Sequence, residues 1–174
     1  APGSIKPYSK FKGEAYIFVR SGTSWSQQAT LVASDYATNS YFGQSVSISG
    51  DYAIVGAYWH NYNDNIEGAA YIFVRSGTSW SQQDKILASD KNRGDNFGES
   101  VSIDGDYAII GAPRDDDNGT QSGSAYIFVR SGTDWSQQSK LTASDGAEVD
   151  YFGDAVSISG NYAIVSAQIG RAHF

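Results

Sequence analysis

Short stretches of the chain follow strand-like patterns of apolar and polar residues. In residues 45–48, small polar and branched apolar side chains alternate with a period of two, which predicts a pleated strand. Residues 52–55 and 70–74 are apolar on both faces, as is typical of strands covered on both sides. A fourth strand is predicted around residues 85–88, and no segment has a helical period. The pattern therefore predicts an all-β protein.

Turn residues separate the predicted strands. Ser49-Gly50-Asp51 joins the first two, and Ser76-Gly77-Thr78 joins the last two. Glycine beside a small polar residue suits a tight hairpin, because such turns require a positive φ. Gln82, Gln83 and Lys85 accompany the fourth strand, which predicts that it forms the outer edge of its sheet.

The whole pattern repeats every 55 residues. The segment AYIFVRSGT recurs identically, and several aromatic residues recur at the same spacing: Trp25, Trp80 and Trp135; Phe42, Phe97 and Phe152; Tyr52, Tyr107 and Tyr162. A period of this length with four strands per unit predicts β-propeller blades. We expect the repeated tryptophans to pack between blades, since they occupy one position in every unit.

The repeats divide the chain into whole and half blades of one propeller domain, residues 1–174. Residues 1–34 are predicted to hold the third and fourth strands of one blade, residues 35–89 and 90–144 two full repeats, and residues 145–174 the first two strands of another. Three blades do not close a ring, because propellers have about four to eight. Either two chains complete a six-bladed ring as a homodimer that exchanges half-blades, or the chain is a piece of a larger ring. The homodimer is favoured, because isolated half-blades would leave apolar strand edges bare.

Two short motifs carry a family resemblance across nearly the whole chain. Phe-Gly opens each unit at residues 42–43, 97–98 and 152–153, and residues 56–57, 111–113 and 166–167 read Gly-Ala, Gly-Ala-Pro and Ser-Ala. These units resemble the FG-GAP repeat, the blade of integrin α-subunit propellers and of many secreted bacterial and some fungal proteins. The resemblance implies a propeller that binds a partner. Related repeats hold Ca²⁺ in an Asp-rich loop between the first two strands, but here that loop is only Ser49-Gly50-Asp51 or its equivalents. It is too short to supply about six to eight oxygens, so the family's calcium site does not carry over. No cofactor is assigned, and Ca²⁺ bound elsewhere stays an open alternative.

The composition narrows the classes of partner. The formal net charge is −7, which argues against nucleic-acid binding. The chain has no cysteine and no apolar run long enough for a membrane helix, so we predict no thiolate metal site and no membrane insertion. A surface rich in Ser, Gly, Asn, Gln and Thr is typical of extracellular or cell-surface β-proteins.

The repeats differ mainly in their loops, and binding residues tend to lie on loops that a rigid scaffold holds. The loop after the second strand therefore supplies the predicted ligand-binding residues: Tyr58, Trp59, His60, Asn61, Arg114, Asp115 and Asp116. Trp59 either stacks on a sugar ring or covers the blade as local core. Asp115 and Asp117 are the weak candidates for metal ligands, and an acidic solvated loop is the simpler explanation.

The predicted function is non-catalytic binding, with a carbohydrate as the leading ligand and a cell-surface protein as the alternative. A glycan-acting enzyme is the third hypothesis, and Glu67 and Asp64 are its candidate acids. No catalytic residue is assigned, because the sequence has only two histidines and none of the common catalytic motifs. Asn118-Gly119-Thr120 matches the N-glycosylation motif.

Overall fold

The computed structural model describes residues 13–35, 40–62 and 65–168, and these residues form strands, turns and loops with no helix. The strands are β1 (Ala15–Ser21), β2 (Ser24–Leu31), β3 (Val46–Ser49), β4 (Tyr52–Ala57), β5 (Asn61–Tyr62), β6 (Asn65–Ile66), β7 (Ala69–Ser76), β8 (Ser79–Ile86), β9 (Ser100–Asp104), β10 (Tyr107–Ala112), β11 (Ser124–Ser131), β12 (Asp134–Leu141), β13 (Val156–Ser159) and β14 (Tyr162–Val165). In this part of the chain nothing is long, helical and apolar enough to span a membrane.

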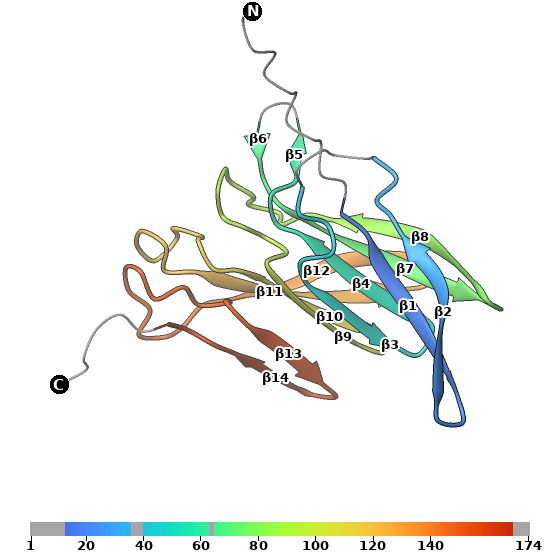
Figure 1. Ribbon diagram of the computed structural model, residues 1–174. Helices are drawn as coiled ribbons and strands as arrows, with labels where there is room; N and C mark the ends of the chain where they lie inside the picture. The colour runs from blue at the N-terminus through green and yellow to red at the C-terminus, as the bar shows by residue number, and fades with distance from the viewer. Residues whose placement is uncertain (1–12, 36–39, 63–64, 169–174) are drawn as a thin grey trace, which may run out of the picture.

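Two four-stranded antiparallel sheets form the centre of the molecule (Figure 1). One has the order β3-β4-β7-β8 and the other β9-β10-β11-β12, with β1-β2 and β13-β14 as two-stranded sheets at either end. The register repeats as well, because Tyr52 lies opposite Val74 in the first sheet and Tyr107 opposite Val129 in the second. The predicted all-β fold of four-stranded propeller blades is confirmed. The ring of two chains stays a prediction.

The fourth strand was predicted in the right place but with the wrong bounds. β8 runs over Ser79–Ile86 rather than around residues 85–88. The hairpin turn consists of Gly77 and Thr78 alone, so Ser76 already pairs with Ser79 and the strand resumes at once. Residues 79–84 are polar except for Trp80 and hid this strand, because an edge strand needs no apolar pattern.

Neighbouring blades pack face to face, and the core lies between them. One cluster of buried side chains joins Ile54 and Ile72 of the first full blade to Ile103, Ala108 and Trp135 of the second. Gly56 allows this close approach, because a Cβ atom there would lie 2.0 Å from the carbonyl oxygen of Gly98. The Gly-Ala motif therefore marks a contact between blades.

The repeated tryptophans pack between blades wherever a preceding blade is present. Trp80 Nε1 donates a hydrogen bond to Gln28 Oε1 at 3.0 Å, and Trp135 Nε1 donates one to Gln83 Oε1 at 3.2 Å. Trp25 has no such neighbour among the described residues and is exposed. The prediction of packing between blades thus fits Trp80 and Trp135, and does not fit Trp25 in the single chain.

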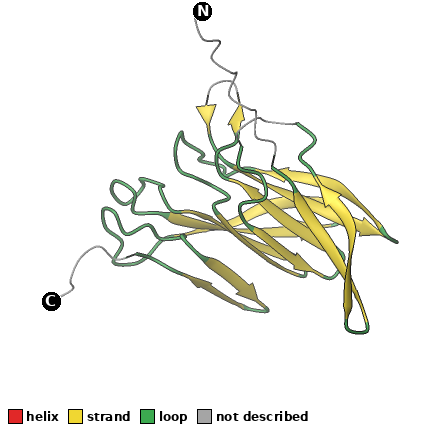
Figure 2. Ribbon diagram, in the orientation of Figure 1, coloured by secondary structure: helices red, strands yellow, loops and turns green. Residues whose placement is uncertain are grey.

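Figure 2 shows that the tight turns gather at one end of the sheets and the long connections at the other. The long connections include residues 58–68, which contain the small β5-β6 hairpin, and residues 113–123. The sheets therefore hold the described parts of the variable loops on one side of the molecule. The candidate site lies there.

Candidate functional site

Three aromatic rings from two loops form one cluster, which we call the aromatic cluster: Tyr41, Tyr58 and Trp59. The rings of Tyr41 and Tyr58 are stacked, with centroids 5.1 Å apart and an angle of 30° between planes. Trp59 stands edge-on to both, at 6.5 Å from Tyr41 and 6.2 Å from Tyr58. Trp59 is 38% exposed and Tyr41 54% exposed. The cluster is thus internally packed and still presents aromatic surface to solvent.

The backbone fixes the geometry of this cluster. The Trp59 amide donates a hydrogen bond to the carbonyl of Ser40 at 3.2 Å, which ties the two loops together. Tyr41 has a φ of 53° and closes a turn in which the Gln44 amide donates to its carbonyl. The left-handed region is unfavourable for a tyrosine, so the surrounding structure must hold Tyr41 in place. The aromatic cluster is therefore held in one arrangement by the backbone.

Charged groups of the next repeat border the aromatic cluster. Burial raises the pKa of Tyr58, neighbouring Tyr41 and Glu99 raise it further, and the positive charge of Arg114 acts in the opposite direction. Arg114 is exposed and stands at the repeat position of Trp59, and its amide donates to the Asp95 carbonyl as that of Trp59 does to Ser40. The structure therefore brings Tyr58, Trp59 and Arg114 to one region. Tyr41, which is not among the predicted ligand-binding residues, belongs with them.

His60 is buried rather than presented to a ligand. Its side chain faces Asp35 and Lys85, with Nε2 at 3.1 Å from Asp35 Oδ2 and 3.0 Å from Lys85 Nζ. Burial and the Lys85 charge lower the pKa of His60, so the ring stays neutral and Nε2 accepts a hydrogen bond from Lys85. Tyr71 Oη also donates to Asp35, at 2.9 Å. Contact of His60 with a ligand stays untested, but its side chain does not lie on the molecular surface.

Asp115 takes the place of His60 in the next repeat and is buried as well. Its Oδ2 lies 2.7 Å from Tyr126 Oη and 2.9 Å from Lys140 Nζ. Lys140 also contacts Asp90, at 2.7 Å, and Asp117. Burial acts to lower the pKa of Lys140, but hydrogen bonds to Asp117, Asp90 and Asp115 outweigh it and raise the pKa.

The charged side chains around Lys140 include the candidate metal ligands Asp115 and Asp117. Together with Asp90 they offer carboxylate oxygens within 4.8 Å of one another. The Lys140 ammonium group contacts all three side chains, so the negative charges already have a cation between them. We therefore assign no metal to this cluster.

The remaining candidates have different environments. The side chain of Asp116 accepts a hydrogen bond from the Gln121 amide, which stabilises the loop, and Asn118 is exposed nearby. Glu67, a candidate catalytic acid, forms an ion pair with Lys91 at 2.6 Å. Asp64 lies outside the described residues, as does the side chain of Asn61. No geometry tests a pair of catalytic acids at Glu67 and Asp64.

Comparison with known proteins identifies the repeat. A family model described as the FG-GAP repeat matches residues 25–73, 80–128 and 135–172. No curated protein matches the chain. The matched segments cover more than half of the sequence and follow one another with the period of the repeated strands. A propeller fold of this kind is typical of binding and adhesion modules. The chain belongs to the FG-GAP repeat family of β-propeller proteins.

Proposed function

We propose that this protein is a non-catalytic carbohydrate-binding module that uses the aromatic cluster as its platform. The single observation that carries the proposal is the set of three rings, Tyr41, Tyr58 and Trp59, packed together at the loop end of the blades with Tyr41 and Trp59 still exposed. Sugar rings have faces of C–H groups that stack on flat aromatic surfaces. A rigid platform binds such a face with little loss of side-chain entropy.

Polar groups suited to hydroxyls stand next to the platform. Arg114 is exposed, and its charge, like that of Glu99, is close enough to affect the pKa of the Tyr58 phenol. A guanidinium group donates hydrogen bonds and a carboxylate accepts them, so the two match the mixed donors and acceptors of a sugar. The aromatic surface supplies contact area, and the charged side chains supply orientation.

The platform occurs once among the described repeats. The positions of Tyr41, Tyr58 and Trp59 are taken by Asn96, Pro113 and Arg114 in the next repeat. A scaffold role would predict aromatic residues at these positions in every blade, as seen for the repeated tryptophans. The difference favours a ligand at this one place.

The test is a glycan array on the purified protein, followed by titration of any sugar that binds. Tyr151→Ala is the matched control, because Tyr151 has the repeat position and positive φ of Tyr41, and no aromatic ring of the described residues stacks on it. We expect Trp59→Ala and Tyr41→Ala to weaken sugar binding at least about tenfold, and Tyr151→Ala to leave it unchanged. An empty array, or equal losses in all three variants, would contradict the sugar proposal and favour a protein partner.

A further inference from the structure

The two-stranded sheets at the ends of the molecule expose side chains that are buried in the middle repeats. Trp25 is 65% exposed, whereas its repeat equivalent Trp135 is 8% exposed. Ile164 is 72% exposed, whereas its equivalent Ile109 is fully buried. The residue types are the same, so the difference lies in what covers them.

The free edges of these two sheets are complementary. β1 pairs with β2 alone and β14 with β13 alone, so among the described residues each has an edge without a partner strand. In the middle blades the equivalents of β14 and β1, namely β10 and β11, pair with each other with Tyr107 opposite Val129. The same register would place Tyr162 opposite Val19 and Ile164 opposite Ile17. One free edge is thus the natural partner of the other.

A cavity marks the place where the β1-β2 sheet would fit. It has a volume of about 280 Å³ and lies between the blade of β9–β12 and the β13-β14 sheet, with Tyr107, Gln138 and Tyr162 in its lining. One repeat earlier, the equivalent space holds Trp135, which packs edge-on against Tyr52 at 6.3 Å and donates to Gln83. Gln138 and Tyr107 are the repeat equivalents of Gln83 and Tyr52. The cavity is therefore a tryptophan socket, and Trp25 is the tryptophan of a matching β1-β2 sheet.

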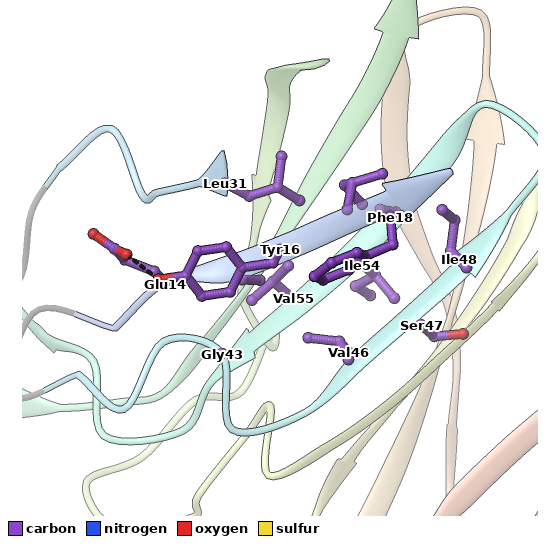
Figure 3. Close-up of a pocket in the computed structure, with 13 residues that line it drawn as sticks. Glu14, Tyr16, Phe18, Leu31, Gly43, Val46, Ser47, Ile48, Ile54 and Val55 are labelled. Carbon is purple, nitrogen blue, oxygen red and sulfur yellow. Dashed lines mark hydrogen bonds between the residues drawn. The ribbon is translucent and has the colours of Figure 1, made fainter. Parts of the chain in front are cut away.

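A second cavity marks the place where the β13-β14 sheet would fit. It has a volume of about 500 Å³, and β1, β3 and β4 line it with Phe18, Ile48 and Ile54 among others (Figure 3). One repeat later, the equivalent space between β7 and β9 is filled by β3 and β4. A β13-β14 sheet has the same strand pattern as β3-β4, with Ile164 in the place of buried Ile54.

We propose that two copies of this chain associate by pairing β14 of each with β1 of the other, so that each exchanged pair of half-sheets becomes a full four-stranded blade. Trp25 of each copy enters the socket that contains Gln138 of the other. The β13-β14 sheet of each copy enters the partner's larger cavity. The two contacts are related by a twofold axis, and the product is a closed ring of six blades.

One pair of residues departs from the repeat at this interface. Ser100 donates to the Gly153 carbonyl across the blades while Gly111 leaves room for it, but the last repeat has Ala155 and Ser166 in their places. Ser166 keeps a hydroxyl, which accepts from the Ala155 amide at 2.8 Å. Its Cβ atom would crowd the incoming carbonyl, so this contact must open slightly. The double variant Ala155→Ser with Ser166→Gly restores the repeat and should tighten the association.

The mass of the purified chain in solution, measured by light scattering across a dilution series, tests the proposal. We expect twice the 18.7 kDa of one chain at high concentration. Trp25→Ala and Ile164→Asp should each raise the dissociation constant at least about tenfold, because each removes buried contact. Both side chains are exposed in the single chain, so circular dichroism should show unchanged folding. Thr78→Asp, in the exposed turn of a middle blade, is the matched control and should change nothing.

Cysteine cross-linking tests the register, since the chain has no cysteine of its own. A mixture of Val19→Cys and Tyr162→Cys chains should form a disulfide, because residues directly opposite on paired strands lie within disulfide range. A mixture of Ile17→Cys and Tyr162→Cys chains, displaced by two residues, should not. A single-chain mass at every concentration, a dimer indifferent to Trp25→Ala and Ile164→Asp, or equal cross-linking of both mixtures would each overturn the proposal.

Discussion

His60 and Asp115 occupy the same position in consecutive repeats, and each is buried against the lysine of its own blade. His60 Nε2 lies 3.0 Å from Lys85 Nζ, and Asp115 Oδ2 lies 2.9 Å from Lys140 Nζ. One fold position therefore accepts a neutral ring in one blade and a carboxylate in the next.

The first prediction concerns acid stability. Because the folded state lowers the pKa of His60, the unfolded chain takes up a proton first as the pH falls below about 6.5. The stability associated with His60 is present above that pH and is lost below it. His60→Asp should remove this part of the pH dependence and change the stability at pH 7 by less than roughly 1 kcal/mol, since Asp115 shows that the site accepts a carboxylate. Thermal unfolding between pH 5 and 8 measures both effects, and an unchanged profile in the variant would contradict the prediction.

The second prediction compares two buried tyrosines. Tyr126 Oη lies 2.9 Å from Asp90 Oδ1 and 2.7 Å from Asp115 Oδ2, whereas Tyr71 Oη faces the single carboxylate of Asp35. The one phenol proton of Tyr126 serves one carboxylate at a time, and of its two acceptors Asp115 is buried whereas Asp35 beside Tyr71 is partly exposed. Tyr126→Phe should therefore cost about 2 kcal/mol and Tyr71→Phe about 1 kcal/mol, because a hydrogen bond to a buried carboxylate contributes more than one to an exposed carboxylate. Urea unfolding of the two variants gives the comparison. Equal costs would show that the second carboxylate adds nothing to the role of Tyr126.

The third prediction concerns Asp95, whose side chain is buried and accepts a hydrogen bond from the Asn92 amide at 2.7 Å. Burial raises its pKa from 3.8 to about 6, and the neighbouring charges of Asp115 and Asp116 act in the same direction. A raised pKa contributes stability that is complete below pH 3.8 and is lost as the pH rises through about 6. Asp95→Asn should therefore stabilise the protein at pH 7 by roughly 1 kcal/mol and flatten the pH profile between pH 4 and 6.

The control for this prediction is Asp95→Ala, which removes the charge and also the acceptor for the Asn92 amide. At pH 7, Asp95→Ala should stabilise the protein less than Asp95→Asn does, or should destabilise it. If the asparagine variant is less stable than the original protein at pH 7, the ionised carboxylate contributes more through its hydrogen bonds than it costs through burial.

The fourth prediction concerns the glycine of the Gly-Ala motif. A Cβ atom at Gly111 would lie 2.0 Å from the Gly153 carbonyl oxygen, a backbone atom that cannot rotate away. Gly111→Ala should therefore separate two blades locally and cost about 3 kcal/mol. Gly77→Asn is the control, since Gly77 lies in an open turn and asparagine tolerates its φ of 62°. Chemical unfolding that finds similar costs for both would mean that close blade contact is not the reason for Gly111.

Local sequence determined the blades. The alternation in residues 45–48, the apolar residues 52–55 and the glycine turns are properties of neighbouring residues, so the repeat predicted the sheets and their antiparallel order. The polar start of β8 escaped prediction, because an edge strand is recognised by its partner and not by its own pattern.

Tertiary structure decided which residues are available for binding. Tyr41 joins Tyr58 and Trp59 only because the fold brings two distant loops together, and His60 leaves the surface because Asp35 and Lys85 surround it. The repeated tryptophans are the clearest case. The sequence around Trp25 is almost the same as that around Trp135, yet one is exposed and the other buried, because burial depends on the neighbouring blade and no residue carries that information by itself.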